Sequence, residues 1–385
     1  MKIMKFGGTS VGKPERMHQV AKLITKDEEA KIVVLSALSG TTNALVEISN
    51  SLSQADRNTA KKQIAALEVH YANFCKQLLS KPDSLEKATL ITNEHFEFLN
   101  IILKISFSEA LNKDILAQGE LLSTKLFSVY LDEQGIDHLL IPALDFMTID
   151  NFDEPQIGSI KVKLAQILHR NKTKKIFITQ GYISRNSKGE VDNLKRGGSD
   201  YSASLIAAAI KASVCEIWTD IDGLHNNDPR VVNKTVAIEQ LSFEEAAELA
   251  YFGAKILHPA SIWPAQQYNV PVKLLNTMQP DAKGTLIQEK AGSVGVKAVA
   301  AKGTRHCDGV PELCPLPAYD GAPEHGVLPG PGQAGPSKHR HQGGACRRDF
   351  GAGRLDGALP PPTLGWPAPA RRHGARNRAG SPGVS

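Results

Sequence analysis

Residues Asn193–Ser204 read Asn-Leu-Lys-Arg-Gly-Gly-Ser-Asp-Tyr-Ser-Ala-Ser, and this stretch is the starting point for the fold that we predict. It lies between an apolar β-type run, Lys175–Thr179, and a helix-like run, Tyr201–Ala212. A loop that opens into a helix presents free N–H groups and the positive end of the helix dipole to an anion. Adjacent glycines let the backbone approach a ligand closely. The alternative is an ordinary capped helix with a surface arginine, since Gly-Gly-Ser-Asp is also common turn chemistry.

Three side chains of this stretch suit an anion site. Ser199 and Asp200 are favoured N-cap types, and Arg196 carries a forked cation that matches a carboxylate or a phosphate.

Two similar segments precede it. The strand-like run Lys2–Phe6 continues into the small-residue loop Gly7–Gly12, after which Pro14 opens a helix. The run Lys31–Leu35 is apolar without alternation, as buried parallel strands are, and continues into the Ser/Thr loop Ser36–Asn43. Strand, small-residue loop and helix repeated in this way predict an α/β fold, a three-layer αβα sandwich on a mainly parallel sheet. Its ligands should lie at the carboxyl ends of the strands.

The remaining pattern extends this fold to about residue 300. We expect a helical excursion over residues 55–112 and helices over 114–133, 244–252 and 259–265, the third with a capping box at Ser242–Glu245. We expect further strands at 139–142, 176–179, 216–219 and 270–275.

Charge and cysteine usage narrow the class of protein. The formal net charge is +5, and residues 301–385 carry all of it, with 11 basic and 6 acidic side chains. The preceding residues are neutral, which gives no support for nucleic-acid binding. Cys75 and Cys215 lack metal-ligand spacing, so we predict no metal site. Two cysteines far apart in the sequence fit a reduced, cytoplasmic protein, which we therefore predict. No signal peptide or membrane span is expected.

Residues 301–385 differ in character from the rest. They hold 13 of the 22 prolines, 16 of the 32 glycines and no isoleucine. Such a composition predicts a disordered Pro/Gly/Arg-rich tail. Because Gly, Pro, Ala and Arg have GC-rich codons whereas the preceding residues use Ile and Lys freely, our hypothesis is translation out of frame, and a genuine flexible tail is the alternative.

The first glycine loop resembles a phosphate-binding P-loop, but Pro14 follows Lys13 where that motif needs Ser or Thr. We therefore expect Lys5 at the strand end, rather than Lys13, to reach phosphate oxygens held by the N–H groups of Gly7 and Gly8. Each remaining candidate is weak alone, since each also fits a cap, a turn, a first-turn acid or a surface charge: Ser36, Thr42, Glu120, Thr219, Asp220, Arg230 and Lys255.

Taken together, seven motifs in order resemble the aspartate kinases of the amino-acid kinase family over residues 1–300. The motifs are Lys5–Gly12, Val33–Asn43, Gln118–Glu120, Leu194–Asp200, Trp218–Asp220, Asp228–Arg230 and Phe252–Pro259. The resemblance implies transfer of the ATP γ-phosphoryl group to the β-carboxylate of L-aspartate, with Mg²⁺. This reaction begins lysine, threonine and methionine biosynthesis.

The resemblance also implies roles for individual residues. Lys5 and Asp200 would be catalytic. L-aspartate would be bound by Ser36, Thr42, Glu120, Arg196, Gly197, Gly198 and Ser199. ATP would be bound by Lys5, Phe6, Gly7, Gly8, Thr219, Asp220, His225, Arg230, Lys255 and Ile256. From the chemistry alone, a carboxylate acceptor is already a nucleophile, so the protein must position two anions and offset their charge.

Three departures from the family pattern stand out. Lys195 replaces the usual glycine, and His225 replaces a common tyrosine. Residues 301–385 show none of the pattern of the ACT domains that bind inhibitory amino acids and help to build the dimer. We therefore expect weakened feedback control and a weakened homodimer. The alternatives are a truncated, inactive nucleotide-binding product and a kinase for another substrate, such as glutamate or a nucleoside monophosphate.

Overall fold

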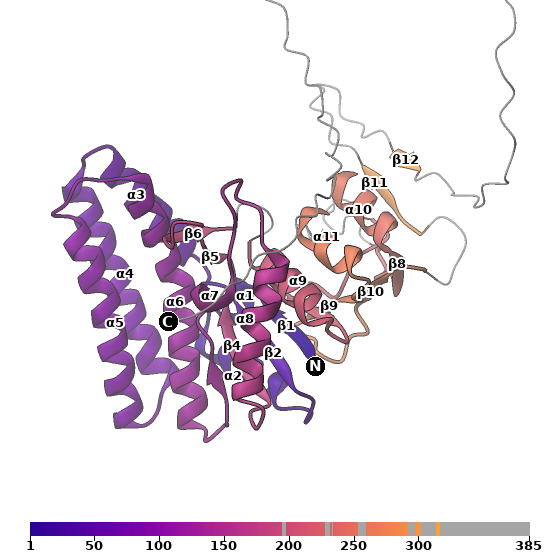
Figure 1. Cartoon of the computed structure of the whole chain (residues 1–385), viewed down its shortest axis with the longest axis horizontal. Coiled ribbons are helices and arrows are strands. Elements are labelled where there is room, and N and C mark those ends of the chain that lie inside the picture. Colours follow the sequence, from indigo (N-terminus) through magenta and orange to yellow (C-terminus); the bar gives the residue numbers. More distant parts are fainter. Residues whose placement is uncertain are drawn as a thin grey trace, which may run out of the picture. The chain divides into compact units, whose positions relative to one another are not determined.

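The computed structural model describes residues 1–194, 198–227, 232, 234–252, 259–291, 297–301 and 313–315. All of them belong to one compact unit, Met1–Gly321. Eight strands form the main sheet in the order β3-β4-β2-β1-β7-β9-β10-β8 (Figure 1). The pairs are parallel except that β10 runs antiparallel to β9. The predicted mainly parallel sheet is thus confirmed.

The strands of the main sheet are β1 (Lys2–Phe6), β2 (Lys31–Leu35), β3 (Leu139–Leu140), β4 (Ile176–Gln180), β7 (Cys215–Thr219), β8 (Gln240–Ser242), β9 (Val272–Asn276) and β10 (Thr285–Gln288). Two-stranded pairs are formed by β5 (Ile183–Arg185) with β6 (Val191–Asn193), and by β11 (Val299–Ala301) with β12 (Leu313–Pro315).

The helices are α1 (Gly8–Val11), α2 (Pro14–Ile24), α3 (Thr41–Ser53), α4 (Arg57–Leu78), α5 (Pro82–Ile102), α6 (Glu109–Glu133), α7 (Ala143–Phe146), α8 (Ile157–Arg170), α9 (Gly198–Ile210), α10 (Phe243–Phe252) and α11 (Pro259–Gln267).

Alternation along the strands divides the hydrophobic core between the two faces of the sheet. On β1, Met4 and Phe6 face the core formed with α2–α6, whereas Ile3 faces the core formed with α7–α11. The neighbouring strand β2 divides its side chains in the same way. The predicted helical excursion over residues 55–112 is formed by α4 and α5, which pack together with α3 and α6 (Figure 1). Two helical layers around one sheet confirm the predicted αβα sandwich.

Several predicted boundaries shift. The loop at residues 7–12 contains the short helix α1, and α9 begins at Gly198, so Ser199 and Asp200 lie in its first turn rather than at the N-cap. The helix expected from Asp114 begins at Glu109, because Ser108 caps it by accepting a hydrogen bond from Leu111 N–H.

The capping box is confirmed. Ser242 N–H donates to Glu245 Oε2 over 2.7 Å, and Glu245 N–H donates to Ser242 Oγ over 3.1 Å. The β5–β6 hairpin and the short strands β8 and β10 were not predicted, since runs of three or four residues carry little periodicity.

Of the predicted tail, the structure describes only residue 301 and Leu313–Pro315, and these take part in the β11–β12 pair, so a short strand does occur there. The other tail residues lie outside the described part of the chain, and their disorder stays a prediction. Cys75 and Cys215 are buried free thiols. Among the described helices, none is long and apolar enough to cross a bilayer.

Candidate active site

The carboxyl ends of β1, β2, β4, β7 and β9 meet at one edge of the sheet, and main-chain hydrogen bonds join the segments that follow them. Ser36 N–H donates to Phe6 O over 3.2 Å, and Gly181 N–H donates to Leu35 O over 2.9 Å. Thr277 N–H donates to Thr219 O over 2.8 Å. In an open α/β sheet this edge is where ligands bind.

The two predicted catalytic side chains are in contact at this edge. The Nζ of Lys5, on the α9 face of β1, lies 2.6 Å from Oδ1 of Asp200 in the first turn of α9. Lys5 is 8% exposed, so little water screens its charge. The Asp200 carboxylate holds the ammonium at the sheet edge, with one side of Lys5 turned toward the glycine loop.

Gly7 and Gly8 lie close to neighbouring segments. The Gly7 N–H, which was predicted to hold phosphate, donates to Trp218 O over 3.3 Å. A Cβ on Gly7 would lie 3.4 Å from Lys5 Nζ, and a Cβ on Gly8 would lie 3.0 Å from Ala37 O. The side chain of Phe6, in contrast, is buried and stacks on Trp218 with ring centroids 5.8 Å apart. Phe6 can therefore offer a nucleotide only its main chain.

Glu120 lies in the middle of α6, not near its start, and is 4% exposed. Its Oε1 accepts a hydrogen bond from Ala37 N–H over 3.3 Å, while within the described part of the chain its Oε2 has no partner. Burial raises the pKa of Glu120 to about 7, against the opposing effect of the Ala37 hydrogen bond. The placement of Glu120 near the start of its helix is therefore wrong, and the alternative of a solvated first-turn acid is excluded because the side chain is buried.

Ser36 and Thr42 lie on either side of the loop that follows β2. Ser36 is half-buried, and its carbonyl accepts a hydrogen bond from Ser123 Oγ over 2.7 Å. Thr42 is exposed in the first turn of α3, whereas its neighbour Thr41 is buried, with Oγ1 3.0 Å from the Tyr71 hydroxyl. Thr42 is therefore free to reach a ligand, and Thr41 anchors the loop.

The start of α9 is shaped by glycine. Gly198 has a left-handed φ of +53°, which favours glycine. Ser199 is buried and packs so closely on Gly181 that any side chain at position 181 would overlap it. Gly198, Ser199 and Asp200 thus stand where β4 and β1 end. Arg196 and Gly197 lie outside the described residues, as does Lys195.

The predicted nucleotide side follows β7. Thr219 Oγ1 lies 3.2 Å from Asp220 Oδ1, and Asp220 is exposed. Further along, His225 Nδ1 is 2.8 Å from Thr235 Oγ1 and its Nε2 is 2.7 Å from Asp222 Oδ1. The imidazole is therefore held by two partners. Arg230, Lys255 and Ile256 lie outside the described residues, so their predicted nucleotide contacts are not located.

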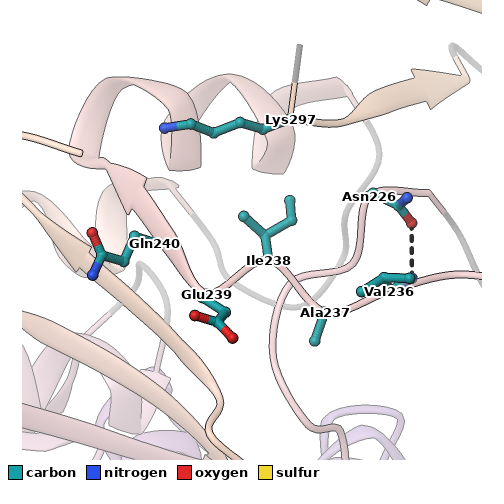
Figure 2. A pocket seen from close by; sticks show the side chains of 7 residues that line it. All are labelled: Asn226, Val236, Ala237, Ile238, Glu239, Gln240 and Lys297. Carbon is teal, nitrogen blue, oxygen red and sulfur yellow. Dashed lines mark hydrogen bonds between the residues drawn. The ribbon is translucent and has the colours of Figure 1, made fainter. Parts of the chain in front are cut away.

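A pocket of about 460 Å³ adjoins this loop (Figure 2). Asn226 and Val236 border it, and the bond from Val236 N–H to Asn226 Oδ1 closes one side. Ile238 supplies apolar surface, and the charges of Glu239 and Lys297 are paired with Lys283 and Glu245 respectively. The pocket offers apolar surface next to His225 without an unpaired charge among its described lining residues.

Residues that the sequence pattern did not single out also belong to the edge. The hydroxyl oxygens of Ser10 and Thr277 lie 2.7 Å apart and join the segments after β1 and β9. Because Thr277 lies just after a predicted strand, its position in the sequence could have indicated that it lies at this edge. No group of three or more His, Cys, Asp or Glu side chains that could hold a metal occurs among the described residues.

Comparison with known proteins agrees with this geometry. Residues 1–276 match the amino acid kinase family. The chain belongs to that family. It is 36% identical over 291 residues to the lysine-sensitive aspartokinase 3 of Escherichia coli strain K12, covering 75% of this chain and 64% of that protein. It is 34% identical to aspartokinase 2, chloroplastic, of Arabidopsis thaliana, covering 74% of this chain and 54% of the relative.

Solved structures give the same result. E. coli aspartokinase III in complex with aspartate and ADP superposes with a TM-score of 0.70 and 33% identity, covering 78% of this chain and 67% of that one. The same enzyme with lysine and aspartate matches equally well. The chain thus spans about two thirds or less of the length of these relatives, and the similarity includes the sheet edge described above.

Proposed function

We propose that this chain is an aspartate kinase, with a catalytic domain over residues 1–300, and that it phosphorylates the β-carboxylate of L-aspartate with ATP. The observation that carries the proposal is the sheet edge itself. A lysine–aspartate pair joins the glycine loop to the first turn of α9. On α6, the buried carboxyl group of Glu120 keeps one oxygen, Oε2, without a partner among the described residues. A cation for phosphate and an anion for an amine are what an amino-acid kinase requires.

In the reaction, an oxygen of the substrate β-carboxylate attacks the γ-phosphorus, and the bond from that phosphorus to the bridging oxygen breaks to release ADP. No general base is needed because the nucleophile is already ionised. Lys5 offsets charge on the transferring group, and Asp200 keeps its ammonium in place. Glu120 binds the substrate amine, and the dipole of α9 favours the substrate anions.

Mg²⁺, bound mainly through phosphate and water oxygens, would offset the charge of the nucleotide. The exposed carboxylate of Asp220 is suited to hold its hydration shell. We place the activity in the cytoplasm, in a homodimer that would be weakened if ACT domains are absent.

The test is ADP release by the purified full chain with Mg-ATP and a panel of L-aspartate, L-glutamate and UMP. We expect turnover with L-aspartate only, and its loss by about 100-fold in Lys5→Met. Turnover with L-glutamate or UMP in place of L-aspartate would identify the chain as a kinase for that acceptor. A folded wild type without turnover on any acceptor would favour the inactive product, and melting with and without Mg-ATP would show whether it binds nucleotide.

A further inference from the structure

Two buried oxygen atoms beside the proposed substrate site have no partner among the described residues: Glu120 Oε2 and Asn193 Oδ1. Asn193 is the last residue of β6 and is 8% exposed. Burying an acceptor without a hydrogen bond is unfavourable, so such groups normally have a partner when the protein is functioning. The family pattern in the sequence assigned no role to Asn193.

The hairpin that carries Asn193 is fixed against α6, the helix that carries Glu120. Lys113 Nζ on α6 lies 2.6 Å from Asp192 Oδ2, and Asp192 is buried. Asn193 N–H donates to Asp192 Oδ1 over 2.7 Å. Lys113 and Glu120 are two helical turns apart on one face of α6. The ion pair therefore fixes the end of β6 against the helix that carries Glu120.

Tyr182 joins these two groups. Its backbone is left-handed, with φ of +65°, which is uncommon for a residue with a side chain. Two hydrogen bonds hold this conformation: Tyr182 N–H donates to Ser202 Oγ over 2.8 Å, and Leu194 N–H donates to Tyr182 O over 2.7 Å. Burial and then the charge of Glu120 raise the pKa of the phenol, and the Asn193 amide opposes this by hydrogen bonding. The phenol is therefore within reach of the charge of Glu120 and of the amide of Asn193.

We propose that Asn193 is a second acceptor for the amine of the amino-acid substrate, beside Glu120, and that Tyr182 positions its amide. The inference rests on the proposed function and deepens it. An ammonium has three N–H donors and suits one anionic and one neutral oxygen, whereas a carboxylate or phosphate would be repelled by Glu120. Asn193 thereby favours α-amino acids over acids that lack the amine.

The test compares L-aspartate with succinate, which has the same carboxylates but no amine. Binding to the full chain in the presence of Mg-ADP is measured by calorimetry for the wild type and Asn193→Ala. We expect the substitution to weaken L-aspartate about 10-fold, the range of a charge-assisted hydrogen bond, and to leave succinate unchanged. Asn50→Ala, an exposed position on α3, is the matched control and should change neither affinity.

Tyr182→Phe tests positioning. It should weaken L-aspartate in the wild type and add nothing in the Asn193→Ala background, because the two residues act as one unit. Melting of each variant establishes that it is folded. Equal weakening of both ligands by Asn193→Ala, or no weakening of L-aspartate, would overturn the inference while leaving the proposed function standing. A folded wild type that binds no L-aspartate would overturn both.

Discussion

Lys5 Nζ and Asp200 Oδ1 lie 2.6 Å apart, joining the end of the first strand to the first turn of α9. The contact places a cation at the glycine loop and fixes it without consuming the whole ammonium, which retains donors for phosphate oxygens. The pair is therefore the part of the edge on which the proposed phosphoryl transfer would depend most directly.

Replacing Lys5 with Met should lower kcat by about 100- to 1,000-fold, because a charge aimed at the transferring group acts mainly in the transition state. Asp200→Asn should lower kcat by about 10-fold or more with little change in the KM for L-aspartate, since it loosens Lys5 without removing it. Steady-state kinetics of ADP release measure both. Lys22→Met, an exposed lysine on α2, should behave as wild type. Unchanged kcat in Lys5→Met would remove Lys5 from the chemistry.

The affinity for L-aspartate should depend on the ionisation of Glu120. In the free protein burial raises its pKa to about 7, and an ammonium binds only the ionised form. Below pH 7 the affinity should therefore fall about tenfold per pH unit, whereas above pH 8 it should be constant. Calorimetry between pH 5.5 and pH 8.5 measures this. Succinate, which has no amine, is the control ligand, and an identical pH profile for both would contradict the assignment.

The free energy of unfolding should also depend on the ionisation of Glu120, but it should fall with rising pH, whereas the affinity for L-aspartate rises. Because the folded-state pKa of Glu120 is about 7 and its ordinary value is 4.5, the folded chain binds a proton more tightly between these pH values. Stability should then fall as pH rises through this window, by about 3 kcal/mol in all. Glu120→Gln removes the charge, so it should stabilise the chain at pH 8 but not at pH 4. Urea unfolding at both pH values tests this, and an equal effect at both would argue against it.

Gly181 should be intolerant of any side chain. A Cβ there would overlap the Cβ and Oγ of Ser199, so Gly181→Ala should displace the start of α9 and raise the KM for L-aspartate about 10-fold or more. Gly158→Ala is the matched control, because no atom lies within 4 Å of its added Cβ. We expect that change in α8 to be neutral or slightly stabilising. Steady-state kinetics and melting of both variants test this prediction. Equal KM values and melting temperatures for the two variants would refute it.

Lys31 should be a structural lysine. It is fully buried, and its Nζ donates to Ile24 O, Asp27 O and Asp27 Oδ1 at 2.7–2.9 Å, closing the end of α2. Lys31→Met leaves these acceptors unpaired and should lower the free energy of unfolding by about 2 kcal/mol or more. Lys26→Met, whose exposed lysine faces Asp281 across 3.6 Å, should change it by less than about 0.5 kcal/mol. Urea unfolding distinguishes the two.

Much of the architecture was already contained in local patterns. Apolar runs that end in small-residue loops predicted β1, β2, β4 and β7, because a buried parallel strand needs apolar residues on both faces. Parallel strands bring their carboxyl ends to one edge, so the sequence alone predicts that Lys5, Ser36, Thr219 and Asp200 share one site. The Ser242–Glu245 box was equally readable, since both of its hydrogen bonds are local.

Local sequence patterns therefore predicted the longer strands and helices, the edge of the sheet where ligands should bind, and the kinds of side chain expected there. The burial, hydrogen bonds and pKa values of those side chains depend on the tertiary structure. Glu120 is a buried acid of raised pKa because α6 packs beneath the Ala37 loop, and the Lys113–Asp192 pair holds the end of β6 against the same helix. Burial and unpaired oxygens depend on which distant segments pack together, and no local period encodes that.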